Sequence, residues 1–434
     1  LHAACPDFLY PGSRYFWRIA RYFALYCLMF VFCLSLSTNR ALGSGLQSTQ
    51  ELTPAEEIIS DALAETPYIN SLLIQREFQV IGGRWGSEIF VDAPLNSEPE
   101  GAQVTLRRAK LKYVRNFGNA WRLKLTGDYT RGGGFELSDN YFSYSGWSQA
   151  LLTFGINDPP FSLESISSSS ALTFMERGLA VNALAERRSG GLTFLRRNPT
   201  NILNASLILF NVSQDNLREE GQGLVLHYVH SPIEYDEGKS VHLGASFSYR
   251  INANEDSTQF RSRPEVGTVN DYFVDTGPIA NADRIGRVSL EANQVRGRFS
   301  WQTELLAARV HRDGQEAVDF WGSYVFASWF LTGDSRNYNF GSGSFEPLKI
   351  GSELFEGGWG AFELAFRASY VDLTDHNVIG GREKNLSIGL NWYANKRIRL
   401  MTNMVKVLDV DRPGSEYDGQ HPLIFSLRAQ WVHN

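Results

Sequence analysis

The sequence predicts an all-β protein, a closed antiparallel β-barrel of about sixteen strands that crosses a membrane. Two observations carry this prediction. All three cysteines lie within the first 33 residues, and a long series of short runs follows in which apolar and polar residues alternate. The aromatic-rich apolar faces of these runs have no second sheet to pack on, and no blade-length repeat suggests a propeller. A soluble β-sandwich is therefore the weaker alternative.

The first 43 residues are predicted to be a signal peptide. Arg14, Arg18 and Arg21 precede an apolar run from Phe23 to Ser37, and small residues follow. The run is short for a spanning helix, which needs about 20 apolar residues, so a retained anchor is the alternative. A start at Leu1 instead of methionine also fits an alternative start codon or an over-extended reading frame.

Residues 44–75 are predicted to be a periplasmic lead-in with one short helix. Thr53 followed by Pro54 is a typical helix start, and Pro67 ends the helix near Glu65. The barrel domain is predicted to span residues 76–434.

From Arg76 onward, side chains alternate with a period of two. Val241, Leu243 and Ala245 share one face of their run, for example, and Ser246 and Ser248 share the other. Such runs predict strands at 76–90, 104–115, 119–131, 139–145, 149–156, 191–197, 203–212, 222–230, 240–250, 286–294, 296–311, 319–332, 358–372, 385–394, 397–407 and 422–432.

The connections between these runs alternate between tight turns and longer loops. Long loops are predicted at 157–190, 251–285, 373–384 and 408–421. Short periplasmic turns and long external loops are typical of outer-membrane barrels. The connection at 333–357 is long, although counting the strands places it at the end of the barrel that has the short turns. It is an exception to this rule.

In a closed barrel the polar faces line the lumen. Five basic residues fall on such faces, and a lumen of fixed cations attracts anions even when the whole chain is acidic. Each could equally be a structural partner for an acidic residue on a neighbouring strand. They are Arg122, Lys124, Arg250, Arg367 and Arg428.

Several stretches, in this order and spacing, resemble the phosphate-selective porin O/P family of Gram-negative outer membranes. They are Phe78–Trp85, Leu106–Leu111, Phe154–Arg177, Tyr324–Asp334, Trp359–Leu364 and Gly389–Asn395. The resemblance implies a homotrimer of barrels with about sixteen strands each. It also implies that the loop at about 157–190 folds inward as a constriction, where Glu164, Ser165, Ser167 and Arg177 would lie.

Family members carry anions along a ladder of arginines. The resemblance implies that this ladder maps onto Arg84, Arg107, Arg108, Arg261 and Arg263. Strict alternation cannot turn both Arg107 and Arg108 into the lumen, so we expect a β-bulge or a strand end there.

Two departures weaken phosphate specificity. Ser165 stands where phosphate-specific members have a constriction lysine, and Glu265 stands where another basic residue would continue the ladder. The resemblance therefore predicts a passive outer-membrane channel that prefers small anions, with phosphate or polyphosphate as weak or unspecific solutes.

Other functions have less support in the sequence. The chain has 41 Lys and Arg against 47 Asp and Glu, which disfavours a nucleic-acid partner. His227, His230 and His242 lack a carboxylate to complete a metal set, so no metal or cofactor is expected. A barrel enzyme of the phospholipase type would need a Ser/His pair, and none stands out. An adhesive barrel acting through its long loops is the remaining alternative.

Overall fold

The structure is a computed structural model of the chain, and it describes residues 71–81, 103–130, 135–212, 221–232, 238–251, 257–267, 269 and 271–433. These residues all belong to one compact unit of the chain. The predicted signal peptide and lead-in helix lie outside the described residues, as does Arg84. The first strand begins at Ser71, five residues before the predicted start of the strand at Arg76.

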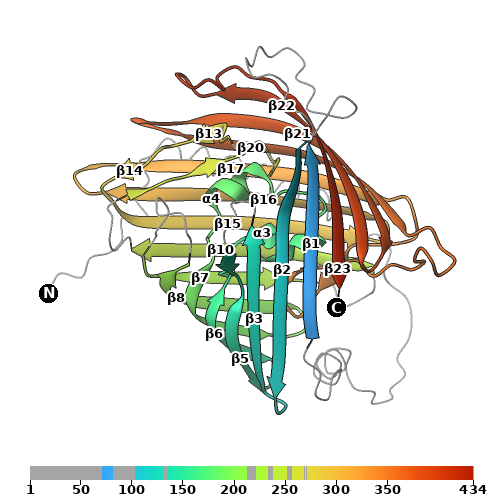
Figure 1. Cartoon of the computed structure of the whole chain (residues 1–434). Coiled ribbons are helices and arrows are strands. Elements are labelled where there is room, and N and C mark those ends of the chain that lie inside the picture. The colour runs from blue at the N-terminus through green and yellow to red at the C-terminus, as the bar shows by residue number, and fades with distance from the viewer. Residues whose placement is uncertain are drawn as a thin grey trace, which may run out of the picture. The chain divides into compact units, whose positions relative to one another are not determined.

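The sequence favours strands because β-branched and aromatic residues alternate with polar ones, and the structure is all-β with antiparallel pairing. Seventeen strands form its main sheet (Figure 1). They are β1 (Ser71–Ile81), β2 (Gln103–Phe117), β3 (Trp121–Thr130), β4 (Phe135–Leu137), β5 (Asn140–Trp147), β6 (Ala150–Asn157), β7 (Ser189–Arg197), β8 (Asn201–Asn211), β9 (Gly223–His230), β10 (Lys239–Ile251), β15 (Ala282–Arg296), β16 (Phe299–Arg312), β17 (Gln315–Phe330), β20 (Ala361–Asp375), β21 (Val378–Asn395), β22 (Ile398–Asp411) and β23 (Leu423–His433).

Short elements fill the longer connections. Between β6 and β7 lie three of them, α3 (Leu163–Ile166), η2 (Ser169–Ala171) and α4 (Leu179–Leu184). The other connections carry two-stranded ribbons made of β11 (Ser257–Thr258) with β14 (Ile279–Ala280), β12 (Arg261–Ser262) with β13 (Val274–Asp275), and β18 (Asn337–Asn339) with β19 (Ser344–Glu346). Among the described residues, no helix has both the length and the apolar character to span a bilayer.

Strands that follow one another in sequence pair as neighbours, and β1 pairs with β2 on one side and with β23 on the other. Every run predicted from the sequence overlaps one of the strands. The three-residue β4, which pairs with β3, was not predicted and takes the count above sixteen.

The long loop predicted at 373–384 is wrong. Strands β20 and β21 continue through this region and meet at a two-residue turn, His376 and Asn377. His376 takes the positive φ of 50° that such a tight turn needs. The polar, glycine-containing stretch after Val378 was misleading because glycines 380 and 381 lie inside the strand rather than in a loop.

The strands bury their polar face and expose their apolar face. On β9, Leu224, Leu226 and Tyr228 are 41%, 39% and 48% exposed, whereas His227 is fully buried. The same inversion holds on β21, where Leu386, Ile388 and Leu390 are exposed while the alternate polar residues Asn385, Ser387 and Asn391 are buried. A soluble sheet would bury the leucines, so this outer surface suits hydrocarbon.

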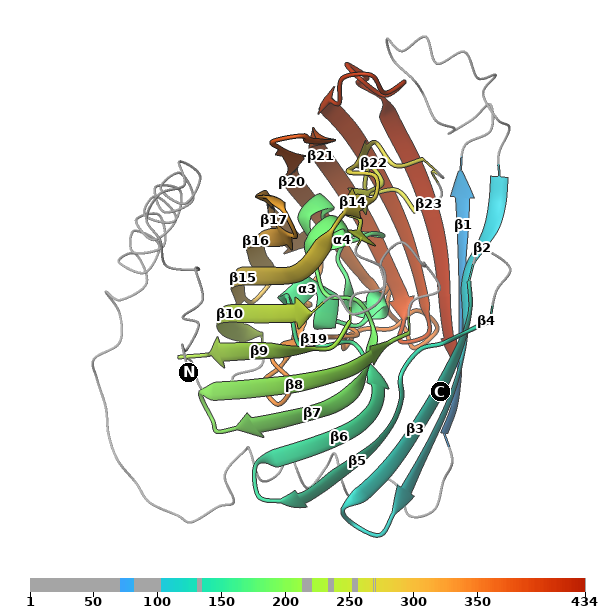
Figure 2. The same ribbon diagram turned by 90° about the vertical axis from the view of Figure 1, so that its left-hand side faces the viewer.

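The interior of the sheet is filled by chain from the connections. Figure 2 shows α3 and α4 on the concave side of the sheet, enclosed by the strands. Apolar side chains of α4, such as Leu179 and Leu184, share a buried cluster with wall residues Leu306, Phe320 and Val371. The core therefore lies between the sheet and the 158–188 segment, and it fixes that segment in place.

The inverted surface generates a prediction for Leu226. We expect Leu226→Arg to lower the free energy of unfolding in lipid vesicles by about 2–4 kcal/mol, because it places a charge against hydrocarbon. A guanidinium titration measures this loss. Leu226→Ala is the matched control, since it removes the same side chain without adding charge. Equal losses for the two variants would contradict a lipid-facing position.

Candidate functional site

The segment between β6 and β7, residues 158–188, starts where two prolines end the strand. Pro159 and Pro160 cannot continue the backbone ladder, and the following Phe161 is fully buried. Ser162 then caps α3, its hydroxyl accepting from the backbone N–H of Ser165 at 3.3 Å. The sequence therefore turns the chain away from the sheet and begins a short helix at once.

Three arginines of the wall hold the backbone of this segment. Arg399 on β22 donates to the carbonyl oxygens of Ser170 (3.2 Å) and Leu172 (2.8 Å). Arg367 on β20 and Arg428 on β23 reach the next turn of chain, where they bind the backbone carbonyl (3.0 Å) and the carboxylate (2.7 Å) of Glu176. All three guanidinium groups are buried. For Arg367 and Arg428, the sequence left open either a contact with solutes or a structural role, and the contacts that they make here are structural.

Buried carboxylates fix the other side of the same segment. Glu304 on β16 accepts from the backbone N–H of Glu164 at 2.8 Å. The Glu164 carboxylate in turn accepts from the N–H of Gly178 at 2.8 Å. Burial raises the pKa of Glu164, and Arg367 at 3.7 Å opposes that effect.

Two further connections enter the interior, and sequence reasoning missed both. Glu265, from the connection between β10 and β15, is buried and lies 2.9 Å from Arg367; it also accepts from the N–H of Leu179 at 3.1 Å. The connection between β17 and β20 brings Phe345, whose N–H donates to the hydroxyl of Ser167 at 3.2 Å. The one signal in the sequence for the connection between β17 and β20 was that it is unusually long for the short-turn side.

A cavity of about 860 Å³ lies between the 158–188 segment and the wall. Five basic and four acidic side chains line it, together with hydroxyls and Asn182. The charged lining residues are Lys124, Arg177, Arg187, Arg188 and Arg261, with Asp139, Asp158, Glu186 and Glu346.

Most of the acidic charge in this cavity is paired. Asp139 lies 2.6 Å from the Lys124 ammonium, and Asp158 lies 2.9 Å from the Arg188 guanidinium. Glu186 is buried and faces two wall arginines as well, Arg287 at 3.0 Å and Arg250 at 3.8 Å. Two of these pairs use basic groups of the same lining, so the positive excess is that of five basic over four acidic side chains.

The structure brings together five of the predicted site residues, since Lys124, Ser165, Ser167, Arg177 and Arg261 line this one cavity. Arg177 donates to the carbonyl oxygens of Glu164 (2.9 Å) and Ser165 (3.1 Å), so it also shapes the segment. Glu164 itself lies behind the cavity as a buried anchor.

The remaining predicted residues lie elsewhere. Arg122 is exposed and donates to Asn116 at 2.9 Å. The guanidinium of Arg263 lies 4.5 Å from the ring centre of Tyr272, which Arg261 also contacts. At Arg107 and Arg108 the expected β-bulge is confirmed. Opposite the consecutive residues Glu77 and Phe78 of β1, the partners are Arg108 and then Leu106, so Arg107 is the extra residue.

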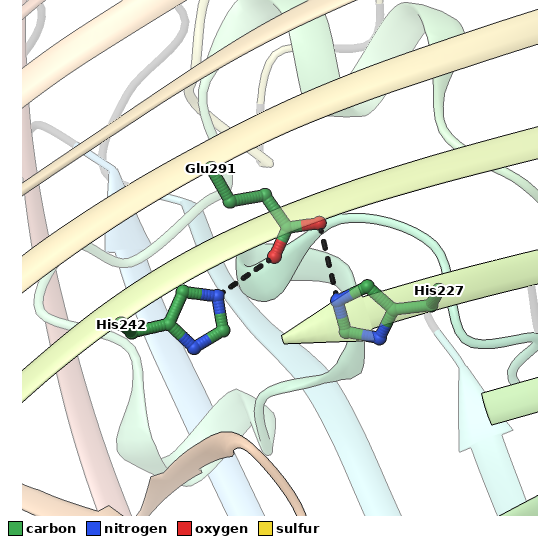
Figure 3. Close-up of side chains that lie close together, drawn as sticks. All are labelled: His227, His242 and Glu291. Atoms are coloured by element: carbon green, nitrogen blue, oxygen red, sulfur yellow. Dashed lines mark hydrogen bonds and ion pairs between the residues drawn. The ribbon is translucent and has the colours of Figure 1, made fainter. Parts of the chain in front are cut away.

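The expectation that no carboxylate joins the histidines is wrong. Glu291 on β15 lies beside His227 and His242, and all three are buried (Figure 3). His230 points to the other face of β9, as expected from its spacing. Strand pairing between β10 and β15 brings Glu291 here, and spacing along the sequence carries no signal of that pairing.

An antiparallel sheet with an apolar outside, a polar inside and an inward segment defines the class of outer-membrane porins. The family model for phosphate-selective porin O and P matches residues 79–433. The chain therefore belongs to the phosphate-selective porin O and P family, whose members reside in the outer membrane of Gram-negative bacteria.

Two curated relatives are similar in sequence. Porin O of Pseudomonas aeruginosa is 25% identical over 340 residues, covering 69% of this chain and 75% of that protein. An uncharacterized protein of Caulobacter vibrioides is 28% identical over 310 residues, covering 65% of this chain. The match spans 61% of the length of the Caulobacter relative.

Solved porin structures share the fold at low sequence identity. OmpF of Salmonella typhi superposes with a TM-score of 0.53 at 11% identity, covering 84% of this chain and 97% of that chain. An anion-selective porin from Comamonas acidovorans gives 0.50 at 12% identity, covering 84% and 99%. These likenesses show the fold.

The buried contacts of Arg367, Arg399 and Arg428 with the 158–188 segment are called the clasp. The clasp generates a prediction for Arg367. We expect Arg367→Gln to lower the free energy of unfolding by about 3–5 kcal/mol, because Glu265 and Glu164 lose their buried partner. Chemical unfolding of the refolded protein measures the change. Arg382→Gln is the control, since Arg382 also binds two carboxylates, those of Asp372 and Asp411, but is 40% exposed. There we expect a loss of about 1 kcal/mol or less, and a comparable loss in both variants would refute the clasp.

Proposed function

We propose that this chain is a passive diffusion channel for small anionic solutes and not an enzyme. The observation that carries the proposal is the cavity beside the 158–188 segment, whose lining has five basic and four acidic side chains and so keeps a net positive charge. Membership of the porin family supports the channel itself. Fixed cations at a narrow passage favour anions through their local field, independent of the net charge of the chain.

The proposed channel is a closed barrel of about sixteen strands, assembled as a homotrimer, with the 158–188 segment as its constriction. Pairing of β1 with both β2 and β23 supports closure. The clasp by Arg367, Arg399 and Arg428 supports a fixed constriction, because a segment held on both sides cannot swing out of the lumen without breaking buried contacts.

The proposed anion path combines residues from the wall and from the segment. Lys124 and Arg261 enter from the predicted set, and Arg177 and Arg187 join them because they line the same cavity. Arg84, Arg107, Arg108, Arg122 and Arg263 are kept as further proposed positions along the path.

Phosphate specificity is proposed to be weak. Ser165 lines the cavity at the place where a lysine would supply a close point charge for a dianion, and neighbouring lining positions 167–169 are also serines. Hydroxyls can donate hydrogen bonds to many anions but add no charge. The channel would therefore favour anions as a class.

An adhesive function through long loops has less support. In the connection between β10 and β15, residues such as Phe260, Glu265 and Phe273 are buried. Chain folded against the interior cannot serve as an extended surface for a partner.

Charge selectivity gives a direct test of the channel. We expect a reversal potential that favours chloride over potassium in a KCl gradient across a planar bilayer. Arg187→Gln should reduce the anion-to-cation permeability ratio about two- to fivefold, since one charge a few ångströms away in a watery site contributes roughly 0.5–1 kcal/mol.

Arg284→Gln is the matched control for this experiment. Arg284 is about half exposed and pairs with its neighbour Asp283, outside the cavity lining. The same charge is lost, so an unchanged ratio isolates position as the cause. A wild-type channel that prefers cations would overturn the proposal.

The block of chloride current by phosphate tests the role of Ser165. In wild-type channels we expect phosphate to reduce chloride current only at high concentration. Ser165→Lys should tighten the block roughly tenfold or more, because a charged hydrogen bond adds about 1.5–3 kcal/mol. Ser169→Lys, which places the same charge elsewhere in the lining, should have a smaller effect. Strong block of the wild type at low phosphate would show that the serine does not weaken binding.

A further inference from the structure

Three metal-binding side chains meet on the inner face of three adjacent strands, away from the cavity described above (Figure 3). His227 comes from β9, His242 from β10 and Glu291 from β15, and all three are buried. His242 Nε2 lies 3.1 Å from one oxygen of Glu291, and His227 Nε2 lies 3.4 Å from the other. One ligand atom from each of the three residues lies within 4.8 Å of the other two.

One nitrogen of this cluster lacks a hydrogen bond. Nε2 of His227 is buried and makes no hydrogen bond within the described part of the chain, because its contact with Glu291 is long and poorly aligned. A buried polar atom without a partner costs free energy, and such an atom aimed at two other ligands needs an explanation. A bound cation supplies one.

The other nitrogen of each imidazole ring, Nδ1, already has a partner. The Tyr338 hydroxyl lies 2.7 Å from Nδ1 of His242, and the Asn204 amide lies 3.4 Å from Nδ1 of His227. A hydroxyl can donate or accept, and an amide can present either its oxygen or its nitrogen. Both rings can therefore hold a proton on Nδ1 and leave Nε2 free, which is the arrangement of metal-binding histidines with outer partners. Ser246 likewise donates to Glu291 at 3.1 Å.

Space at the cluster depends on Gly244. A Cβ at this position would lie 2.8 Å from His242 Nε2 and 2.9 Å from a Glu291 oxygen. Gly244 is the residue opposite Glu291 in the ladder between β10 and β15, so a larger residue would project directly into the ligands. The glycine keeps the centre of the cluster open.

We propose that His227, His242 and Glu291 bind one divalent transition-metal ion of the Zn²⁺ type. Two imidazoles and one carboxylate suit zinc and its neighbours far better than calcium or magnesium. Metal–ligand bonds of about 2.0–2.2 Å in a tetrahedron separate neighbouring donor atoms by roughly 3.3 Å, close to the two contacts around Glu291. Three protein ligands leave a fourth position for water or a small solute.

The ion would tie β9, β10 and β15 together and fix the hairpin of β18 and β19 through Tyr338. A small cavity of about 40 Å³, lined by Tyr338, Ser240 and Lys349 among others, adjoins this hairpin. The site does not depend on which solutes the channel carries.

The test uses the full-length refolded protein in detergent. Equilibrium dialysis against Zn²⁺ with elemental analysis should give one tightly held ion per chain, and Co²⁺ should give a visible absorption band from the same site. His227→Gln and Gly244→Ala should each weaken Zn²⁺ binding at least about tenfold, and Tyr338→Phe about 10- to 100-fold through the outer partner.

His230→Gln is the control, because this histidine lies on the same strand but faces the other way and contacts Asn201. Its Zn²⁺ affinity should match the wild type, with folding of each variant checked by circular dichroism. Wild-type protein that takes up no stoichiometric Zn²⁺ would overturn the proposal, whatever the variants do. Equal uptake by His227→Gln and wild type would do the same.

Discussion

Hydrocarbon offers no hydrogen-bond partners, and this constraint shapes every level of the molecule. Backbone groups must be paired strand to strand, and polar side chains must all turn to one face. The sheet obeys both demands: leucines of β9 and β21 are exposed while serines, asparagines and charged residues are buried behind them. Whatever enters the interior must then satisfy a polar wall, which is why the inward connections bring their own carboxylates and carbonyls.

Charge in the interior is divided between two tasks. Wall arginines such as Arg367, Arg399 and Arg428 donate hydrogen bonds to carbonyl groups and carboxylates of the inward chain. Most of the basic groups that line the cavity sit on that chain itself, at Arg177, Arg187 and Arg188. An arginine on a lumen-facing strand position is therefore not by itself a solute contact. Whether such an arginine contacts a solute depends on its hydrogen-bond partner. That partner usually comes from a connection rather than from the next strand.

The sequence was sufficient to locate the strands, because a period of two survives wherever one face meets lipid. It also predicted the bulge at Arg107 and Arg108, since two adjacent arginines cannot share a face. Prediction from the sequence failed where the structure depends on contacts between residues far apart in the chain. Arg367 and Glu265 lie about a hundred residues apart and only the folded chain brings them together. The turn at His376 was missed because its surrounding polar residues resemble a loop.

The histidine cluster shows the same limit most sharply. His227 and His242 are visible in the sequence, but Glu291 joins them only because β10 pairs with β15 in a register that sets Gly244 opposite Glu291. A shift of one residue would turn the carboxylate to the lipid face, where a charge is costly. The wall thus has two separate polar centres, one that holds the 158–188 segment and one across β9, β10 and β15. Only the first is needed to explain a channel, so the second requires a cause of its own, and its chemistry points to a cation.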